Sequence, residues 1–248
     1  MGRSVSPSGG SGRTPEIPTP QVKAEYLSLI DIFRELPTEE ITRLAVDLPM
    51  RTYSPGAVIY APGEHSDVLF LLKRCTVNIV QQVPDGKRLI TRVLQPYTFF
   101  GEMGLVAEQF PEWASAQAVD DVLVCLIERG VIERLVLSYP YVGLRLLERI
   151  AARLVEAEAA LASFAYAPIT ARLARVLVRL AEKDSDRVVH ASHDQLAALV
   201  GTYRETITTA LHHLQRFGVI ELSRRSIHVL DMSGLEQLAS TWSSRYSG

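Results

Sequence analysis

Residues 192–230 read SHDQLAALVGTYRETITTALHHLQRFGVIELSRRSIHVL, and this stretch decides the fold of the C-terminal part. Ser192 and Gln195 have the S-x-x-Q spacing of a capping box, which starts a short helix. Gly201 stands where the chain must reverse, with an expected positive backbone angle φ. Thr202 is interpreted as the N-cap of a longer helix, and two short strands follow. This order predicts a winged helix-turn-helix, whose second helix enters the DNA major groove.

The second helix begins with the residues that such a motif presents to base edges. Arg204 can donate two hydrogen bonds to guanine, and Glu205 can accept one from cytosine N4. The alternative is an exposed pair within the helix, with Glu205 in a capping role. Arg224-Arg225 at the hairpin turn is expected to contact phosphates, or else to be a solvated turn. The predicted DNA-contacting residues are Ser192, Thr202, Tyr203, Arg204, Glu205, Thr206, Thr208, Thr209, Arg224 and Arg225.

The composition is that of an ordinary globular protein, with 248 residues, 47% hydrophobic and 22% charged. The net charge is −2, although residues 168–231 carry nine Arg or Lys against seven Asp or Glu. The DNA-binding prediction therefore depends on the motif. The two cysteines, Cys75 and Cys125, are expected in strands as small buried residues, not as a disulfide framework. Because no apolar signal region or membrane-spanning run occurs, we expect a cytoplasmic location.

The rest of the chain predicts an α+β protein with four segments. Residues 1–21 are rich in Ser, Gly and Pro and are expected to be a disordered tail. Residues 22–139 are expected to form a sensory domain, with two short helices over 24–48 and Thr38 as an N-cap. From residue 52 to 127 the period is two, with many turn signals, which indicates an antiparallel barrel or double-sheet roll. A long helix over 140–166 and a DNA-binding domain over 167–248 complete the chain.

The long helix carries apolar residues at heptad spacing and is expected to end before Pro168. So narrow a stripe suits a partner helix, which predicts a homodimer; packing on the chain's own barrel is the alternative. Two-fold proteins also match palindromic DNA sites. The predicted dimer residues are Leu144, Leu147, Ala151, Leu154, Glu158 and Leu161.

Two stretches carry a family resemblance: LVGTYRETITTALHHLQRFGVIEL in the DNA-binding half and PDGKRLITRVLQPYTFFGEMGL in the sensory half. Over residues 25–235 the chain resembles the cyclic-AMP receptor protein/FNR family of bacterial transcription regulators. The resemblance implies a cyclic-nucleotide-binding-type β-roll, a dimer helix and a winged helix. It also implies a homodimer on two-fold DNA, with half-sites like TGTGA, that contacts RNA polymerase. Thr209 replaces a third base-reading position, which is often Arg in the family.

The resemblance also places an effector pocket, formed by Gly101, Glu102, Met103, Glu112, Trp113, Ala114, Ala157 and Glu158. Glu102 matches the glutamate that holds the ribose in cyclic-AMP binders. Glu112-Trp113 replaces the Arg-Ser pair that binds the cyclic phosphate, and Ala157-Glu158 replaces the Thr-Ser pair that contacts adenine. An acidic residue in place of the arginine repels phosphate. We therefore expect a regulator that is independent of cyclic AMP, with another small-molecule effector or none.

Other functions remain as alternatives. Glu102 favours a retained cyclic-nucleotide response with an altered pocket, and Cys75 or Cys125 could sense oxidants. Cys75 and Tyr97 stand where the family has turn glycines, so a positive φ there is strained or the turns are remodelled. Nothing in the sequence indicates a metal site, a cofactor, an iron–sulfur cluster or an enzyme.

Overall fold

A computed structural model describes residues 18–64, 66–82, 87–106 and 114–240 of the chain. The chain divides into an N-terminal unit, Met1–Val80 with Arg92–Glu148, and a C-terminal unit, Gln81–Thr91 with Arg149–Gly248. The segment Gln81–Thr91 is thus grouped with the C-terminal unit, although it lies in the first half of the sequence.

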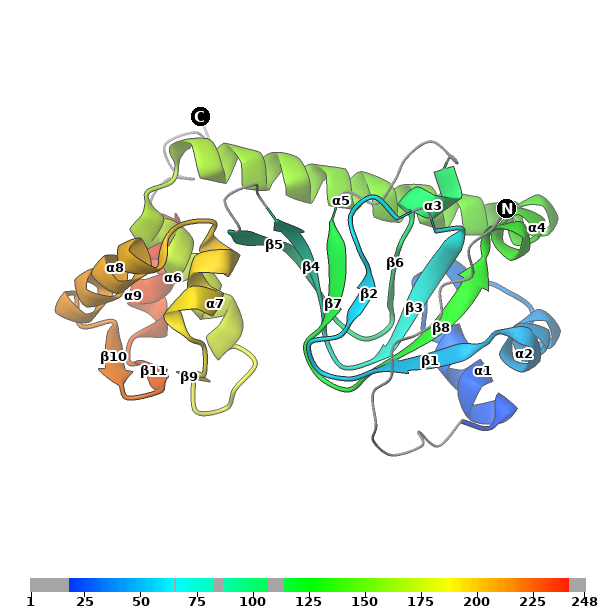
Figure 1. Cartoon of the computed structure of the whole chain (residues 1–248), viewed down its shortest axis with the longest axis horizontal. Helices are drawn as coiled ribbons and strands as arrows, with labels where there is room; N and C mark the ends of the chain where they lie inside the picture. Colours follow the sequence, from blue (N-terminus) through cyan, green and yellow to red (C-terminus); the bar gives the residue numbers. More distant parts are fainter. Residues whose placement is uncertain (1–17, 65, 83–86, 107–113, 241–248) are drawn as a thin grey trace. The chain divides into compact units, whose positions relative to one another are not determined.

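Two four-stranded sheets form a roll, as predicted, and most of their strands belong to the N-terminal unit (Figure 1). The first has the order β1 (Met50–Tyr53), β8 (Val122–Glu128), β3 (Val68–Arg74) and β6 (Thr98–Phe100). The second has the order β2 (Val58–Tyr60), β7 (Ser115–Ala118), β4 (Val77–Gln82) and β5 (Arg88–Leu94). A short helix, α3 (Met103–Val106), follows β6.

The strands β3 and β8 are buried on both faces, which explains their continuous apolar runs. Phe70 and Val124 pack into the core between the sheets, together with residues of β2, β4, β6 and β7. Leu71 and Cys125, paired across the two strands, point into a second core with the helices. These helices are α1 (Pro20–Ser28), a 3₁₀ turn (Asp31–Phe33), α2 (Thr38–Asp47) and α4 (Arg129–Ser138). Because successive side chains of a strand point to opposite faces, β3 and β8 contribute residues to both cores.

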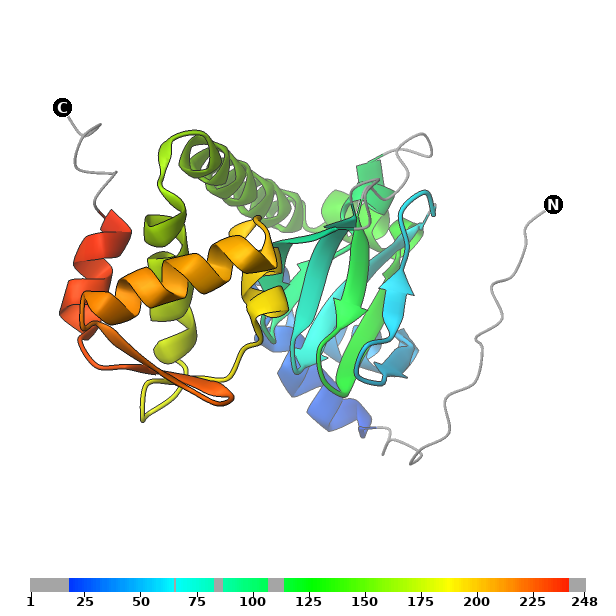
Figure 2. The ribbon, with the colours of Figure 1, turned by 60° about the vertical axis from the view of Figure 1, so that its left-hand side comes forward.

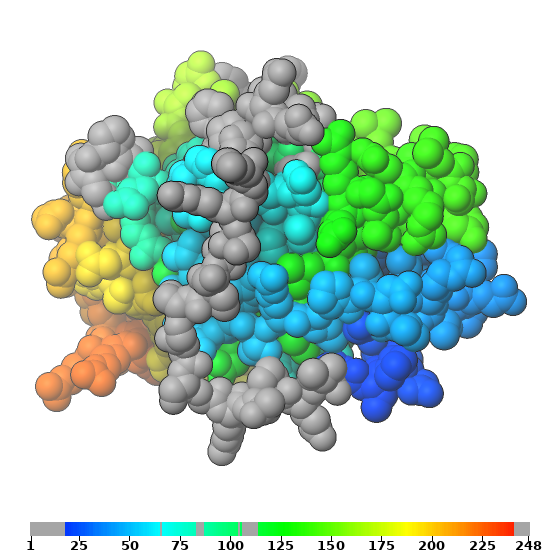
Figure 3. Space-filling view, turned by 45° about the vertical axis from the view of Figure 1, so that its right-hand side comes forward, coloured from blue at the N-terminus to red at the C-terminus, as the bar shows by residue number. Residues whose placement is uncertain are grey.

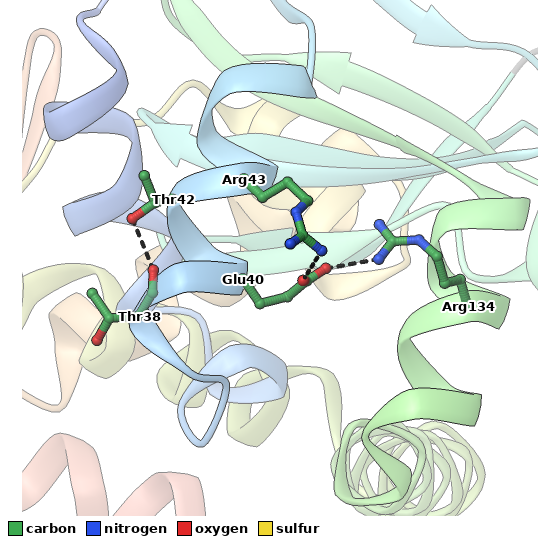
Figure 4. Close-up of polar contacts among 5 residues, drawn as sticks. All are labelled: Thr38, Glu40, Thr42, Arg43 and Arg134. Carbon is green, nitrogen blue, oxygen red and sulfur yellow. Dashed lines mark hydrogen bonds and ion pairs between the residues drawn. The ribbon is translucent and has the colours of Figure 1, made fainter.

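A buried carboxylate joins α2 to α4 (Figure 4). Glu40 is only 4% exposed, and its oxygens accept hydrogen bonds from Arg43 Nη1 at 2.8 Å and Arg134 Nη1 at 2.7 Å. Both arginines remain partly solvated. The two charge-assisted bonds satisfy a group that would be costly to bury alone.

The C-terminal unit has a helical core and a small sheet (Figure 2). Helix α5 (Pro140–Tyr166) continues into it, and Pro168 is the N-cap of α6 (Ile169–Ala181). Then come β9 (Val188–Val189), α7 (His193–Val200), α8 (Arg204–Arg216), β10 (Ile220–Ser223), β11 (Ser226–Val229) and α9 (Met232–Ser240). The hairpin of β10 and β11 projects from this unit (Figure 3, orange).

Some details differ from the sequence predictions. Helix α1 begins at Pro20, inside the expected tail, and residues 1–17 lie outside the described residues. Thr38 is the first residue of α2 and not its N-cap, because Pro37, with a fixed φ, takes that position. Cys75 lies after β3 and not in a strand. Cys75 and Tyr97 keep positive φ angles of 68° and 67°, so these turns are not remodelled.

Candidate nucleic-acid interface

The first helix of the motif, α7, starts at the predicted capping box. Ser192 Oγ accepts a hydrogen bond from the Gln195 backbone N at 3.1 Å, and Gln195 Oε1 accepts one from the Ser192 N at 2.7 Å. The helix ends at Gly201, whose φ is +72° as expected. The prediction for Thr202 was wrong: Tyr203 is the N-cap of α8, and the helix begins at Arg204. Arg204 and Glu205 therefore occupy the first two positions of α8.

Helix α8 divides into a buried and an exposed side. Ile207, Leu211 and Leu214 are fully buried in the core of the C-terminal unit. Arg204 and Glu205 are exposed at the start of the helix, before this stripe begins. The burial of one stripe fixes which residues of α8 can meet a partner.

The side chain of Arg204 is 64% exposed and only loosely restrained. Its Nε lies 3.9 Å from Asp194 Oδ2 on α7, and that carboxylate is also solvated. An exposed pair at this distance contributes little, so the guanidinium is available to a ligand. The nearest ion-pair partner is thus on α7 and is not Glu205, in contrast to the intrahelical alternative.

The two threonines on the next turn are tied to the protein. Thr208 Oγ1 donates to the Arg204 carbonyl at 3.0 Å and lies 2.8 Å from His193 Nδ1, while Thr209 Oγ1 donates to the Glu205 carbonyl at 3.1 Å. Thr209 is exposed and Thr208 is half-buried. Thr206 and Thr209 also line a hollow of about 420 Å³ together with Glu205, at the start of α6.

A second hollow, of about 560 Å³, lies between the start of α7 and the hairpin. Ser192, Arg224 and Arg225 line it, as do His190 and His193. The structure thus brings three predicted contact residues together with two histidines that the sequence analysis did not single out. Arginine, serine and imidazole N–H groups at a concave surface are donors suited to phosphate oxygens.

The turn between α7 and α8 is held by a residue that the sequence analysis missed. Arg172 of α6 donates from Nη2 to the carbonyls of Val200 at 2.7 Å and Gly201 at 3.1 Å. Its guanidinium stacks 4.5 Å from the centroid of the Phe164 ring. Burial, and secondarily Arg175, lowers the pKa of Arg172. The spacing of Arg172 from the turn gives no signal, because the contact depends on how α6 packs.

The structure describes some of the residues predicted to form the effector pocket in the N-terminal unit. Gly101 has φ +82°, and Glu102 Oε1 accepts a hydrogen bond from Arg92 Nη1 of β5 at 3.1 Å. Met103 begins α3, and Ala114 is half-buried. Glu112 and Trp113 lie outside the described residues. The ribose-binding carboxylate expected from the resemblance is therefore engaged by a cation of its own chain.

The stripe on α5 is exposed. Leu144, Leu147, Leu154 and Leu161 are each about 59–71% exposed. Ala151, Ala157 and Glu158 are exposed as well. Large apolar side chains repeated along a helix and left in solvent are typical of a surface that another helix covers.

Two family models match the chain. A cyclic nucleotide-binding domain covers residues 50–139, and a Crp-like helix-turn-helix domain covers residues 171–238. A cyclic AMP receptor protein from Thermus thermophilus is 30% identical over 208 residues, which are 84% of this chain and 96% of that protein. The chain belongs to the cyclic-AMP receptor protein/FNR family of transcription regulators. The resemblance found in the sequence is thereby confirmed, and the chain is a regulator with a helix-turn-helix DNA-binding domain.

Other relatives agree with this assignment. A CRP-like cAMP-activated global transcriptional regulator from Mycobacterium tuberculosis is 27% identical over 87% of this chain and 99% of that protein. A solved CRP/FNR-family regulator, also from Thermus thermophilus, is 28% identical with a TM-score of 0.68, covering 77% of this chain and 98% of that one. Within the described ranges, no helix has the length and hydrophobicity to span a membrane, and no three metal-binding side chains cluster.

Proposed function

We propose that this family member acts as a homodimer on two-fold DNA, with α8 of each copy in a major groove. The main support for this proposal is the exposed first turn of α8, where the side chains of Arg204 and Glu205 are accessible to solvent. Recognition helices about 34 Å apart read successive major grooves. Because Arg204 and Glu205 match the family's base-reading positions, a TGTGA-like half-site is proposed. Family membership also supports a contact with RNA polymerase and action in the cytoplasm.

Selection of duplexes from a random-sequence library by the purified protein tests this proposal. The recovered sites should contain two inverted copies of one short motif, at the spacing of one helical turn. Recovery of a single unrepeated motif, or of no motif at low salt, would contradict it.

Dimerisation through α5 is argued from the exposed leucine stripe. A matched pair of variants tests it: Leu154→Lys on the stripe, and Leu137→Lys on α4, where the leucine is 83% exposed and off the stripe. A lysine at a helix–helix seam places two like charges in an apolar contact. Light scattering should show monomers for Leu154→Lys only, with DNA affinity lost in parallel. Equal behaviour of the two variants would contradict the assigned seam.

Independence from cyclic AMP is the second part of the proposal. Glu102 is already paired with Arg92, and Glu112 replaces the phosphate-binding arginine of the cyclic-AMP binders. A lost charge-assisted hydrogen bond costs about 1.5–3 kcal/mol. Two such losses weaken binding by about 10²–10⁴-fold. Calorimetry with cyclic AMP and cyclic GMP should show no micromolar binding.

A cyclic-nucleotide-responsive regulator is the competing candidate. It is favoured by the presence of Glu102 and by relatives whose names describe cyclic-AMP activation. Micromolar binding of either nucleotide, accompanied by tighter DNA binding, would establish it in place of the effector-independent form. Thiol sensing through Cys125 is disfavoured, because burial raises the pKa of this thiol to about 11 and keeps it protonated.

A further inference from the structure

A lysine from the sensory half of the sequence stands at the beginning of the recognition helix. Lys87 directly precedes β5 and belongs to the C-terminal unit by its contacts. Its Nζ donates a hydrogen bond to Tyr203 Oη at 2.7 Å and lies 3.9 Å from the centroid of the Tyr203 ring. Tyr203 is the N-cap of α8, one residue before Arg204. An ammonium group from residue 87 therefore adjoins the turn that reads bases.

Packing, and not a single flexible side chain, sets this position. Leu89, two residues after Lys87, approaches the turn so closely that a Cβ at Gly201 would lie 3.1 Å from Leu89 Cδ1. The same Cβ would lie 2.4 Å from Phe164 Cε1. Arg172 also holds this turn, by hydrogen bonds to the carbonyls of Val200 and Gly201. The start of β5 is thus seated on the turn that precedes the recognition helix.

The contact does not cover the residues that face the groove. Tyr203 remains 56% exposed, and the side chain of Arg204 is 64% exposed. If residue 87 blocked the recognition helix from DNA, the side chains of Tyr203 and Arg204 would be buried. The structure instead adds a cation beside a surface that stays open.

The chemistry of the pair suits an anionic oxygen. The Tyr203 hydroxyl accepts a hydrogen bond from Lys87, which leaves the phenolic proton to donate elsewhere. The ammonium of Lys87 is a cation with N–H donors, and such a group forms charge-assisted hydrogen bonds with phosphate oxygens. When a helix enters the groove by its N-terminus, the residues just before it lie at the groove edge, beside the phosphates.

We propose that Lys87 and Tyr203 together bind a DNA backbone phosphate at the edge of the half-site. This inference rests on the proposed DNA-bound dimer and adds a phosphate contact supplied by the sensory half of the sequence. The contact is independent of base identity, so it positions α8 without choosing the sequence. In a chain with a net charge of −2, such local cations supply the attraction to DNA.

The test measures the binding of Lys87→Ala to a library-selected duplex and to poly(dI-dC) at several salt concentrations. Each lost phosphate contact lowers the slope of log K against log salt by about 0.9, which is about 1.8 for a dimer. Affinity should fall roughly tenfold on both DNAs, so that the specificity ratio is unchanged. Lys87→Arg should keep the slope, and Arg51→Ala, which removes an exposed cation on β1, should match the parent.

The Tyr203→Phe variant completes a double-mutant cycle. Its loss in affinity should overlap with that of Lys87→Ala, because both contact the same phosphate. Tighter binding by Lys87→Ala would show that the contact restrains the motif, and an unchanged salt slope would show a purely structural contact. Either result overturns the proposed phosphate contact. The proposed function is unaffected by these results as long as the parent protein binds DNA specifically. Absence of specific binding by the parent would remove both.

Discussion

Two glycines with the same backbone angle give a matched test of how the helix-turn-helix is built. Gly201 and Gly218 both have φ +72°. A Cβ at Gly218 would meet nothing within 4 Å, whereas a Cβ at Gly201 would lie 2.4 Å and 2.8 Å from two atoms of the Phe164 ring. Alanine at either position therefore carries the same backbone penalty, and only Gly201→Ala adds a clash.

The magnitudes separate the two variants. A left-handed backbone conformation costs an L-residue about 1–2 kcal/mol of folding free energy. Replacing glycine by alanine also makes the unfolded chain less flexible, which stabilises the folded state by about 0.4–1 kcal/mol. Gly218→Ala should therefore lose about 1 kcal/mol. Overpacking adds about 1–3 kcal/mol, which brings the loss for Gly201→Ala to about 2–4 kcal/mol.

Hydrogen exchange of the amides in α6, α7 and α8 measures these free energies within the C-terminal unit. The C-terminal unit of Gly201→Ala should open more readily than that of Gly218→Ala by about 5- to 150-fold, the factors that correspond to about 1–3 kcal/mol. DNA affinity should fall with Gly201→Ala because the turn that seats α8 moves. Equal losses for the two variants would refute the packing of Phe164 against this turn.

Three further predictions concern stability. Ser192→Ala should cost about 1 kcal/mol in the opening of α7, because the capping box is lost, and an unchanged exchange rate would contradict it. Arg134→Ala should destabilise the N-terminal unit in urea by about 1–3 kcal/mol, since buried Glu40 loses a partner, whereas the exposed Arg129 pair should contribute under about 1 kcal/mol to the same measurement. Burial raises the folded pKa of Cys125 from 9.0 to about 11, so its contribution is complete below pH 9 and is lost as pH rises toward 11. The free energy of unfolding that is lost between pH 9 and 11 should be smaller in Cys125→Ala, by at most about 2–3 kcal/mol. An identical pH profile in the variant and the parent would contradict the raised pKa of Cys125.

The sequence predicted the elements whose periodicity reflects burial. The long helix α5 begins and ends where expected, and strands fill the region in which a period of two was found. Local turn chemistry was less predictable: Thr202 and Thr38 both resemble N-caps, but Tyr203 and Pro37 take those positions. A hydroxyl residue indicates a helix start only within a residue or so, because neighbouring backbone angles decide the cap.

Contacts between distant segments could not be predicted. The bond between Lys87 and Tyr203 joins residues 116 positions apart, and Arg172 reaches the turn across 28 positions. Neither has a spacing that a local pattern records. Conversely, the family resemblance located Glu102, but only the structure shows that Arg92 already binds it. Periodicity and motifs therefore predicted the fold and located the exposed first turn of α8, while packing supplied the residues that support this turn.

In the proposed complex, Arg204 selects one base of the half-site. The most direct measurement is competition binding of the parent protein and Arg204→Ala to every single-base variant of the selected half-site. The parent should discriminate by about 1–3 kcal/mol at one guanine, and the variant should lose that preference there while keeping it at the other positions. Unchanged discrimination at all positions in Arg204→Ala would contradict base recognition by Arg204.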